Sequence, residues 1–180
     1  MEILSMGEKI KRKRKELNMT LKDLAGSRIT PGQISLVESG KSNPSMDLLE
    51  YLANNLNTTV EYLMESEEAQ ADRICLFYQN IAEAQILNSD LLQAEQNIDK
   101  SIYFCEKYKL EYRRARNLSL RGDIYMEQHD IASAQQVFLS ANVVFIKNNS
   151  YEEIIKTLLK LGKITLKLRG YQSASSYFKQ

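Results

Sequence analysis

The stretch TLKDLAGSRITPGQISLVESGKSNP, residues 20–44, decides the fold of the N-terminal part of the chain. It predicts two short helices joined by a tight turn and followed by a polar loop. Thr20 is placed to cap the first helix, in which apolar residues recur at i, i+3 and i+4 over residues 21–25. The second helix opens with a capping box at residues 30–33 and stops at Ser39-Gly40. Neither helix is long enough to be stable alone, so the pair must belong to a small helical domain.

The second of these helices predicts a surface for reading DNA. Ile34 and Val37 form its buried side, and its first turn presents small or hydrogen-bonding side chains on the other side. A helix with a polar N-terminal turn exposed in this way is the form that enters the major groove of duplex DNA. The alternative, an ordinary helical hairpin, fits the same periodicity. On the DNA-binding hypothesis the contacting residues are Thr20, Arg28, Thr30, Pro31, Gly32, Gln33, Ser35, Lys41, Ser42 and Asn43.

Two motifs in this region carry a family resemblance. The pattern T-L-x-x-L-A at residues 20–25, followed by I-S-x-V-E-x-G-K-x-x-P-S at residues 34–45, resembles the Cro/repressor (XRE) type of helix-turn-helix. The resemblance spans residues 6–64 and implies a five-helix domain over residues 1–64. The turn is one residue shorter than is usual in that family, and Gly26 directly follows the first helix.

The resemblance also implies roles for two sets of residues outside the reading helix. The polar loop at residues 41–44 is expected to hold a DNA phosphate. Arg14 is expected to form a structural pair with Glu38, bracing the first helix against the reading helix. The other basic residues of the run 11–15 form either a solvated face or additional phosphate contacts.

Composition restricts the class of protein. Of 180 residues, only 7 are Gly and 2 are Pro, both before residue 45, which predicts an all-α chain. Without an apolar run of about 20 residues or a leading signal peptide, the chain is predicted to be soluble and cytoplasmic, with its two cysteines reduced. His129 stands alone beside Asp130 and is predicted to be a surface residue. We expect no cofactor, no metal ion and no enzymatic activity.

The net charge of +1 conceals an uneven distribution of charge. Residues 1–41 hold nine Lys or Arg against five acidic residues, whereas residues 42–72 hold seven acidic residues and no Lys or Arg. Because phosphate neutralisation is a local effect, the basic excess around the reading helix favours a nucleic-acid partner. Residues 65–72 are predicted to be a semi-rigid helical linker between two domains.

Residues 73–180 repeat with a period of 40. Ala82, Gly122 and Gly162 correspond to one another, and larger apolar residues recur in the same way at Ile98, Phe138 and Phe178. The pattern L-x-x-x-G-x-x-Y with A-x-x-x-F-x-x-A at residues 118–141 resembles the tetratricopeptide repeat. The predicted helix pairs are 71–88 with 90–108, 111–128 with 131–148, and 151–169 with 171–180, about two and a half repeats of a helical-hairpin solenoid. Because a solenoid needs a polar cap, we expect either a longer native chain or a partner that covers the last helix.

The first helix of each pair is expected to line a concave groove. A basic stripe on the last of these helices, together with polar residues on the others, predicts a site for an extended acidic peptide or its C-terminus. The alternative for the stripe is a solvated face. The predicted ligand residues are Gln79, Asn80, Arg116, Ser119, Lys156, Lys160 and Lys163.

The combination of a Cro-type domain with tetratricopeptide repeats resembles the peptide-responsive transcription regulators of Gram-positive bacteria. That resemblance implies a homodimer that binds double-stranded DNA and responds to a short signalling peptide. The alternative is a scaffold whose repeats hold a protein partner, with DNA binding secondary. A peptide-sized groove favours the first function, and a broad flat surface favours the second.

Overall fold

The computed structural model describes residues 2–169, with side chains for residues 2–166. All regular structure within these residues is α-helical, so the predicted all-α fold class is confirmed for them. The chain divides into two compact units, unit 1 (Met1–Gln70) and unit 2 (Ala71–Gln180), and each is described by itself. The predicted helix over 171–180, with its repeat positions Ala174 and Phe178, lies outside the described residues.

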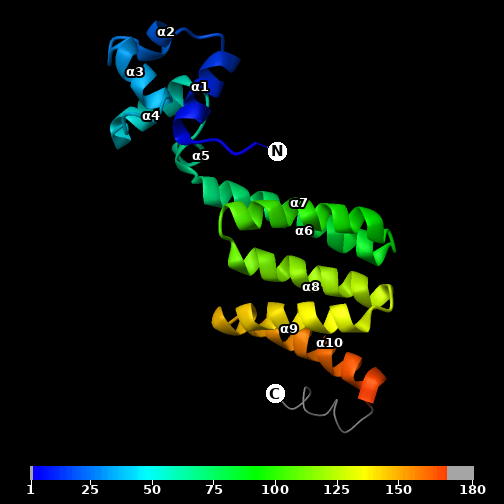
Figure 1. The fold of residues 1–180 in the computed structure, drawn as a ribbon. Coiled ribbons are helices and arrows are strands. Elements are labelled where there is room, and N and C mark those ends of the chain that lie inside the picture. Colours follow the sequence, from blue (N-terminus) through cyan, green and yellow to red (C-terminus); the bar gives the residue numbers. More distant parts are fainter. Residues whose placement is uncertain (1, 170–180) are drawn as a thin grey trace. The chain divides into compact units, whose positions relative to one another are not determined.

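Unit 1 contains five helices before α6 begins (Figure 1). A Ser or Thr hydroxyl caps each of them by accepting the backbone N–H three residues further on, which explains where each helix starts. The helices are α1 (Met6–Glu16), α2 (Leu21–Ala25), α3 (Pro31–Glu38), α4 (Met46–Asn55) and α5 (Val60–Met64), with caps at Ser5, Thr20, Thr30, Ser45 and Thr59.

The core of unit 1 draws at least one fully buried side chain from each of these helices. Ile10, Leu24, Ile34, Leu52 and Leu63 are all 0% exposed and belong to one hydrophobic cluster. Burial of this kind is the main source of stability for helices too short to persist alone.

Two apolar residues at helix ends are exposed and lie outside this core. Leu17, which follows α1 as its C-cap, is 39% exposed, and Met46, the first residue of α4, is 53% exposed. Leu48 and Tyr51 of α4 are the opposite case. Both are half-buried and pack against the core.

A fully buried lysine and a buried glutamine hold the end of unit 1 together. Lys9 of α1 donates from Nζ to the carbonyl oxygens of Tyr62 (2.8 Å) and Glu65 (2.7 Å), at the C-terminal end of α5. Gln70 pairs through its amide with the backbone of Leu4, donating at 2.8 Å and accepting at 3.1 Å. Unit 1 therefore includes the first turn of α6, and the predicted linker at residues 65–72 is divided between the two units.

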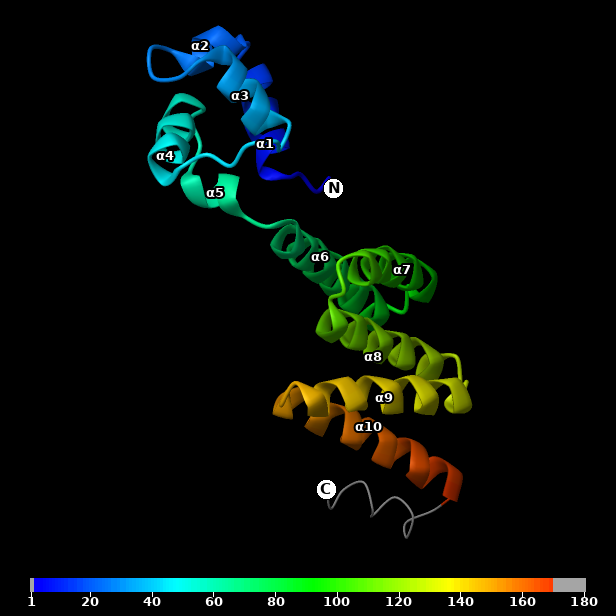
Figure 2. The same cartoon turned by 60° about the vertical axis from the view of Figure 1, so that its left-hand side comes forward.

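Unit 2 is a stack of antiparallel helices with a regular period. It contains the rest of α6 (Glu67–Leu87), then α7 (Leu91–Lys107), α8 (Glu111–Glu127), α9 (Ile131–Lys147) and α10 (Tyr151–Arg169) (Figure 2). The starts of α7, α8, α9 and α10 are spaced 20 residues apart, so a repeat of 40 residues contains two helices. The predicted helix pairs are confirmed within the described residues.

The turns between these helices explain the period. Ser89, Lys109, His129 and Asn149 follow their helices at 20-residue intervals with φ of 60°, 56°, 61° and 52°. The next residue at each turn donates its N–H to a carbonyl five residues back, at 2.8–2.9 Å, which is the Schellman type of helix end. His129 is exposed, as predicted, and it is the positive-φ residue of the turn between α8 and α9.

Close approach of helices within the stack depends on Gly122. A Cβ atom at this position would lie 2.6 Å from Cε1 of Phe138, which is fully buried on α9. Only glycine leaves room for the Phe138 ring to pack this close to α8. The repeat therefore pairs a small residue on one helix with a large apolar side chain on the next helix.

Candidate functional site

The turn between α2 and α3 sets the orientation of the predicted reading helix. Gly26 ends α2 at φ 55° and ψ −136°, a conformation that side-chain-bearing residues rarely adopt. A Cβ atom there would lie 2.6 Å from the hydroxyl of Tyr51, which donates to the carbonyl oxygen of Ala25 at 3.2 Å. Tyr51 therefore closes the shortened turn from α4, and Arg28 lies over the tyrosine ring at 5.4 Å from its centroid.

Helix α3 separates a buried side from an exposed side. Ile34, Val37 and Glu38 are buried, at 0%, 3% and 9% exposure. The other side carries four of the predicted DNA contacts, Pro31, Gly32, Gln33 and Ser35. All ten predicted DNA-contact residues are exposed: Thr20, Arg28, Thr30, Pro31, Gly32, Gln33, Ser35, Lys41, Ser42 and Asn43. The structure thus brings the α3 residues and the following loop to the surface of unit 1.

Gln33 has a structural role in addition to its predicted reading role. Its Oε1 accepts hydrogen bonds from the Thr30 backbone N–H (3.0 Å) and the Thr30 hydroxyl (3.3 Å), completing the capping box. A bidentate contact with adenine requires both the amide oxygen and the amide nitrogen. Gln33 would have to leave the cap to make that contact.

The loop after α3 presents backbone and side-chain donors together. Gly40 has φ 70°, and the N–H groups of Lys41 and Ser42 both donate to the carbonyl oxygen of Leu36, at 2.9 and 3.3 Å. These bonds hold the loop against the end of α3 and leave the side chains of Lys41, Ser42 and Asn43 exposed. A fixed loop with an exposed lysine is suited to contact a phosphate group.

Arg14 ties α1 to α3 through a two-point ion pair. Its Nε lies 2.6 Å from Glu38 Oε1, its Nη2 lies 2.9 Å from Glu38 Oε2, and its Nη1 donates to the Met19 carbonyl oxygen at 2.9 Å. The hydrogen bond with Glu38 raises the pKa of the Arg14 guanidinium. With side-chain exposures of 12% and 7%, the two residues belong to the interior of unit 1 and not to the exposed side of α3.

Residues 10–63 match the Helix-turn-helix family model. The chain is also 34% identical over 71 residues to the HTH-type transcriptional regulator DdrOP3 of Deinococcus deserti, a match that covers 39% of this chain and 55% of the relative. The match therefore spans about half the length of that curated relative.

Solved structures with some overall similarity include regulators crystallised with their ligands. ComR from S. thermophilus, in complex with DNA and its signalling peptide ComS, gives a TM-score of 0.44 at 13% identity over 90% of this chain and 100% of that chain. PlcR from Bacillus thuringiensis, in complex with the peptide PapR7 and DNA, gives 0.36 at 14% identity over 97% of this chain and 94% of that chain.

Within the helix-turn-helix segment, one exposed residue was missing from the predicted contacts. Leu36 is 46% exposed on the same side of α3 as Ser35, off the buried Ile34 and Val37 stripe. An apolar side chain on a reading helix contacts the methyl group of thymine. The helical spacing of residues 34–37 would have identified Leu36, because a leucine one position before Val37 cannot share its buried side.

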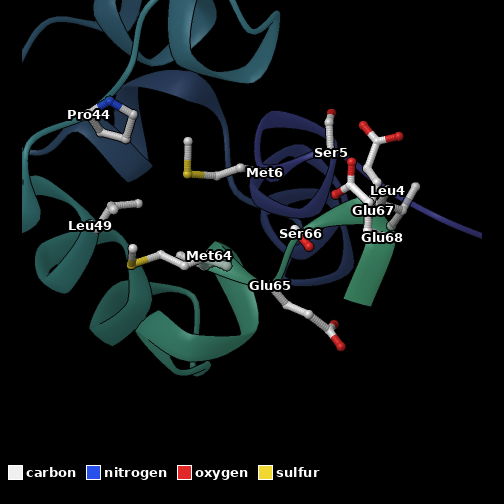
Figure 3. A pocket seen from close by; sticks show the side chains of 11 residues that line it. Leu4, Ser5, Met6, Pro44, Leu49, Met64, Glu65, Ser66, Glu67 and Glu68 are labelled. Atoms are coloured by element: carbon white, nitrogen blue, oxygen red, sulfur yellow. The ribbon is translucent and has the colours of Figure 1, made fainter. Parts of the chain in front are cut away.

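A cavity of about 500 Å³ lies within unit 1, where α5 meets the start of α6 (Figure 3). Its apolar lining comes from Leu4, Met6, Leu49, Leu63 and Met64, together with Pro44. Glu65, Glu67 and Glu68 stand at its edge. Three of the seven acidic residues of the segment 42–72 thus lie together beside the first turn of α6.

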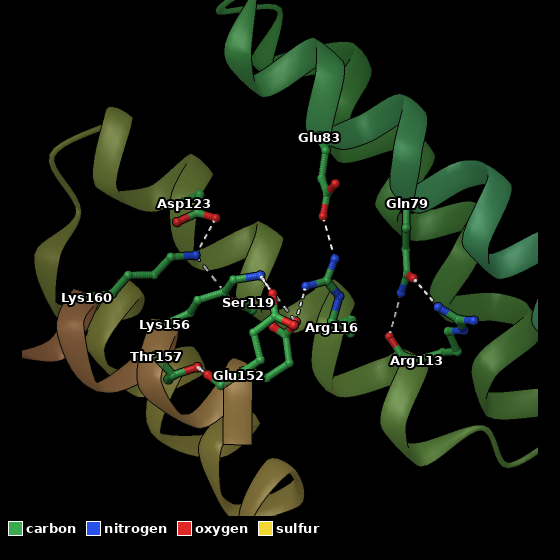
Figure 4. A network of polar contacts seen from close by, with 11 residues as sticks. Gln79, Glu83, Arg113, Arg116, Ser119, Asp123, Glu152, Lys156, Thr157 and Lys160 are labelled. Carbon is green, nitrogen blue, oxygen red and sulfur yellow. Dashed lines mark hydrogen bonds and ion pairs between the residues drawn. The ribbon is translucent and has the colours of Figure 1, made fainter. Parts of the chain in front are cut away.

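In unit 2, a groove of about 320 Å³ lies between α6, α8 and α10. Figure 4 shows its charged side chains pairing across these three helices. Arg116 binds Glu83 at 2.6 Å and Glu153 at 2.7 Å, and Lys160 binds Asp123 at 2.7 Å. Burial raises the pKa of the Asp123 carboxyl, although the Lys160 ammonium opposes that change.

This groove unites some of the predicted ligand residues and leaves out others. Arg116, Ser119, Lys156 and Lys160 line it. Gln79 does not, because it is 1% exposed and donates to the Arg113 carbonyl oxygen at 2.8 Å, joining α6 to α8. Asn80 and Lys163 are exposed but are not among the lining residues.

Both predicted stripe lysines that line the groove are paired with carboxylates. Lys156 is paired with Glu152 of α10 itself at 2.6 Å, and Lys160 is paired with Asp123 of α8 at 2.7 Å. The Lys160 pair crosses between helices, so the charges of α10 alone do not reveal it. An acidic ligand would therefore have to displace a resident carboxylate.

Two further features bear on chemistry beyond binding. Cys75 and Cys105 lie on α6 and α7 with their Sγ atoms 3.4 Å apart, and both are buried free thiols. Among the described residues, no group of three His, Cys, Asp or Glu side chains is placed to hold a metal ion. None of the helices in the described range combines the length and apolar character needed to cross a membrane.

Proposed function

We infer that this chain is a sequence-specific DNA-binding transcriptional regulator that acts as a homodimer on duplex DNA. The observation that carries the proposal is that the Helix-turn-helix match, residues 10–63, covers the segment in which α3 presents a capped polar first turn to solvent. Unit 1 supplies a DNA reader, and no catalytic role is proposed for the chain. Its place of action would be the cytoplasm, with the DNA.

The proposal assigns different tasks to α3 and to the loop after it. Gln33, Ser35 and Leu36 would face base edges in the major groove, with Thr30, Pro31 and Gly32 bringing the backbone close. Lys41, Ser42 and Asn43 would contact phosphate groups, together with Thr20 and Arg28 at the ends of α2 and its turn. A dimer would place two such readers on half-sites about 34 Å apart, or a multiple of that distance.

The test is a comparison of binding to a selected site and to random duplex DNA. The site is first isolated from a randomised library, and affinities are then measured by fluorescence anisotropy across a salt series. Leu36→Ala should lower the ratio of specific to non-specific affinity by about 5-fold or more, because it removes a base contact. Lys41→Ala should weaken both DNAs alike and reduce the salt slope by about 0.9.

Lys107→Ala, a lysine substitution in unit 2, is the matched control and should change neither quantity. Failure of the wild-type chain to enrich any sequence from the library would contradict the proposed function. Equal losses on selected and random DNA for Leu36→Ala would remove Leu36 from the reading surface.

A second candidate function concerns the groove in unit 2. We propose that it takes a short peptide whose binding alters the DNA affinity of the dimer. Its volume of about 320 Å³ fits a few side chains of an extended peptide rather than a broad protein surface, which favours this function over the scaffold. Because Arg116 is held between Glu83 and Glu153, a peptide carboxylate would bind by exchanging with one of them.

This candidate is tested by screening a library of short synthetic peptides against the full chain by isothermal titration calorimetry. Any peptide that binds should lose affinity at least about 10-fold with Lys160→Met. Lys163 is exposed on the same helix but does not line the groove, so the Lys163→Met variant should bind the peptide with unchanged affinity. Equal effects from both substitutions would place the peptide elsewhere.

A further inference from the structure

The period of 20 residues makes α9 the counterpart of α7, so that each residue of α9 corresponds to the residue 40 positions earlier. The exposed surface of α7 carries charges at Asp99, Lys100, Glu106 and Lys107. The same positions on α9 hold Leu139, Ser140, Ile146 and Lys147, and Tyr103 is replaced by Val143. Two helices in equivalent positions therefore present surfaces of opposite character.

The exposed apolar residues of α9 lie on one stripe, at i, i+4 and i+7. We call Leu139, Val143 and Ile146 the α9 stripe, and they are 43%, 67% and 55% exposed. The opposite side of α9 buries Ala134, Phe138, Ala141 and Phe145 at 0% exposure. A helix that is apolar on both sides is characteristic of a buried position, and α9 contains a single charged residue, Lys147.

A helix that follows α10 would not cover this stripe. The counterparts on α7 remain exposed although α8, α9 and α10 all follow: the Asp99 and Glu106 side chains are 64% and 63% exposed, and Tyr103 is 61% exposed. By the same comparison, one more helix pair added to the stack would leave the α9 stripe exposed to solvent. The stripe therefore needs a partner from outside its own stack.

The exposed apolar residues of α10 are a different case. Ile155 and Leu159 are 58% and 47% exposed, but their counterparts on α8, Ala115 and Ser119, are buried at 1% and 7%. Ala115 is covered by residues of α9, the helix that follows α8. Ile155 and Leu159 therefore occupy positions that are buried elsewhere in the stack, unlike the positions of the α9 stripe.

We propose that the α9 stripe is the surface on which a second copy of this chain docks. The proposal rests on the proposed function, because a reader of two DNA half-sites needs two copies related by a two-fold axis. With that axis near Val143 and the two α9 helices antiparallel, Leu139 of each copy faces Ile146 of the other. The two Lys147 ammonium groups then lie at opposite ends of the contact, where they do not repel each other.

The composition of the stripe agrees with such an interface. Its centre is apolar and free of charge, and its edges, at Gln136 and Ser140, are polar and exposed. An apolar stripe is complemented by another apolar stripe, and a second α9 supplies one of the same length and composition.

The test measures the mass of the full chain by sedimentation velocity over a concentration series, without DNA. Val143→Glu places two carboxylates against each other at the two-fold axis and should raise the dimer dissociation constant at least about 100-fold. Tyr103→Glu, the same substitution at the equivalent position of α7, should leave the dimer unchanged. Because no DNA is present, failure of the dimer and failure of DNA recognition are measured separately.

A second variant keeps the proposal testable if Val143→Glu does not fold. Under mild oxidation, Val143→Cys should form a covalent homodimer across the axis, whereas Tyr103→Cys should not. The inference is overturned if the wild-type chain is a monomer throughout, if Val143→Glu remains dimeric, or if the two cysteine variants cross-link equally.

Discussion

Replacing Arg14 by alanine is the most direct way to test the interior of unit 1. The guanidinium makes two hydrogen bonds to Glu38 and one to the Met19 carbonyl oxygen, and Glu38 is 9% exposed as a residue. Removing Arg14 leaves a buried carboxylate without its counter-charge, which costs about 3 kcal/mol. For about 70 residues the whole free energy of unfolding is roughly 4–10 kcal/mol, so the loss is a large fraction of it.

The expected result is a decrease of about 10–20 °C in the melting temperature of unit 1. Hydrogen exchange on the full chain, followed by mass spectrometry of peptides from α1 and α3, reports unit 1 separately from unit 2. Lys13→Ala, whose ammonium forms an i,i+3 pair with Glu16 on the exposed side of α1, should leave this exchange unchanged.

A double variant isolates the cause of the loss. Arg14→Met combined with Glu38→Leu removes both charges together and should recover at least half of the stability, because no carboxylate is then buried alone. If the double variant is as unstable as Arg14→Ala, the loss comes from packing and not from the stranded charge. If Lys13→Ala opens unit 1 to the same degree as Arg14→Ala, the distinction between the two residues is wrong.

Three further substitutions test other parts of the fold. Gly122→Ala would place a Cβ atom 2.6 Å from the Phe138 ring, and chemical denaturation should show unit 2 destabilised by about 1–3 kcal/mol; no loss would mean that the ring moves freely. Lys9→Met removes the ammonium that donates to the Tyr62 and Glu65 carbonyl oxygens, so amide hydrogen exchange at the end of α5 should become faster. Unchanged exchange there would refute the view that Lys9 caps this helix end. Hydrogen bonds from Thr20 lower the pKa of Asp23 below its ordinary value of 3.8. The ionised Asp23 side chain therefore stabilises the fold above pH 3.8, and this stabilisation is lost as the pH falls through the lowered pKa of the folded state. Asp23→Asn should therefore reduce the acid sensitivity of unit 1, and an identical pH profile of unfolding for the variant would contradict the assignment.

Much of the helical architecture followed from local sequence. Hydroxyl residues at helix starts, glycine after α3, and apolar spacing within each segment act over a few residues, so they predict helices wherever they occur. The period of 40 likewise predicted the helix pairs of unit 2, because equivalent positions must pack in equivalent ways. The exposed N-terminal turn of α3 was predictable for the same reason, since the buried stripe at Ile34 and Val37 determines the opposite side.

Other features depended on which residues meet from distant parts of the chain. Lys9 lies on a helix that reads as basic and solvated, yet the end of α5 surrounds it and its charge meets backbone carbonyl oxygens. Tyr51 lies on α4, and its hydroxyl donates to the carbonyl oxygen of Ala25 at the end of α2. Lys160 belongs to the predicted basic stripe of α10, but Asp123 on α8 pairs with it.

The sequence alone therefore determined where helices begin and end, which of their sides are apolar, and where the chain repeats. These properties depend on hydrogen bonds and contacts between residues close together in the chain. The tertiary structure alone decided which charges are neutralised between helices and which apolar stripe remains uncovered. Those outcomes depend on distances between helices far apart in the sequence, because an ion pair or a buried contact exists only where folding brings both partners within a few ångströms.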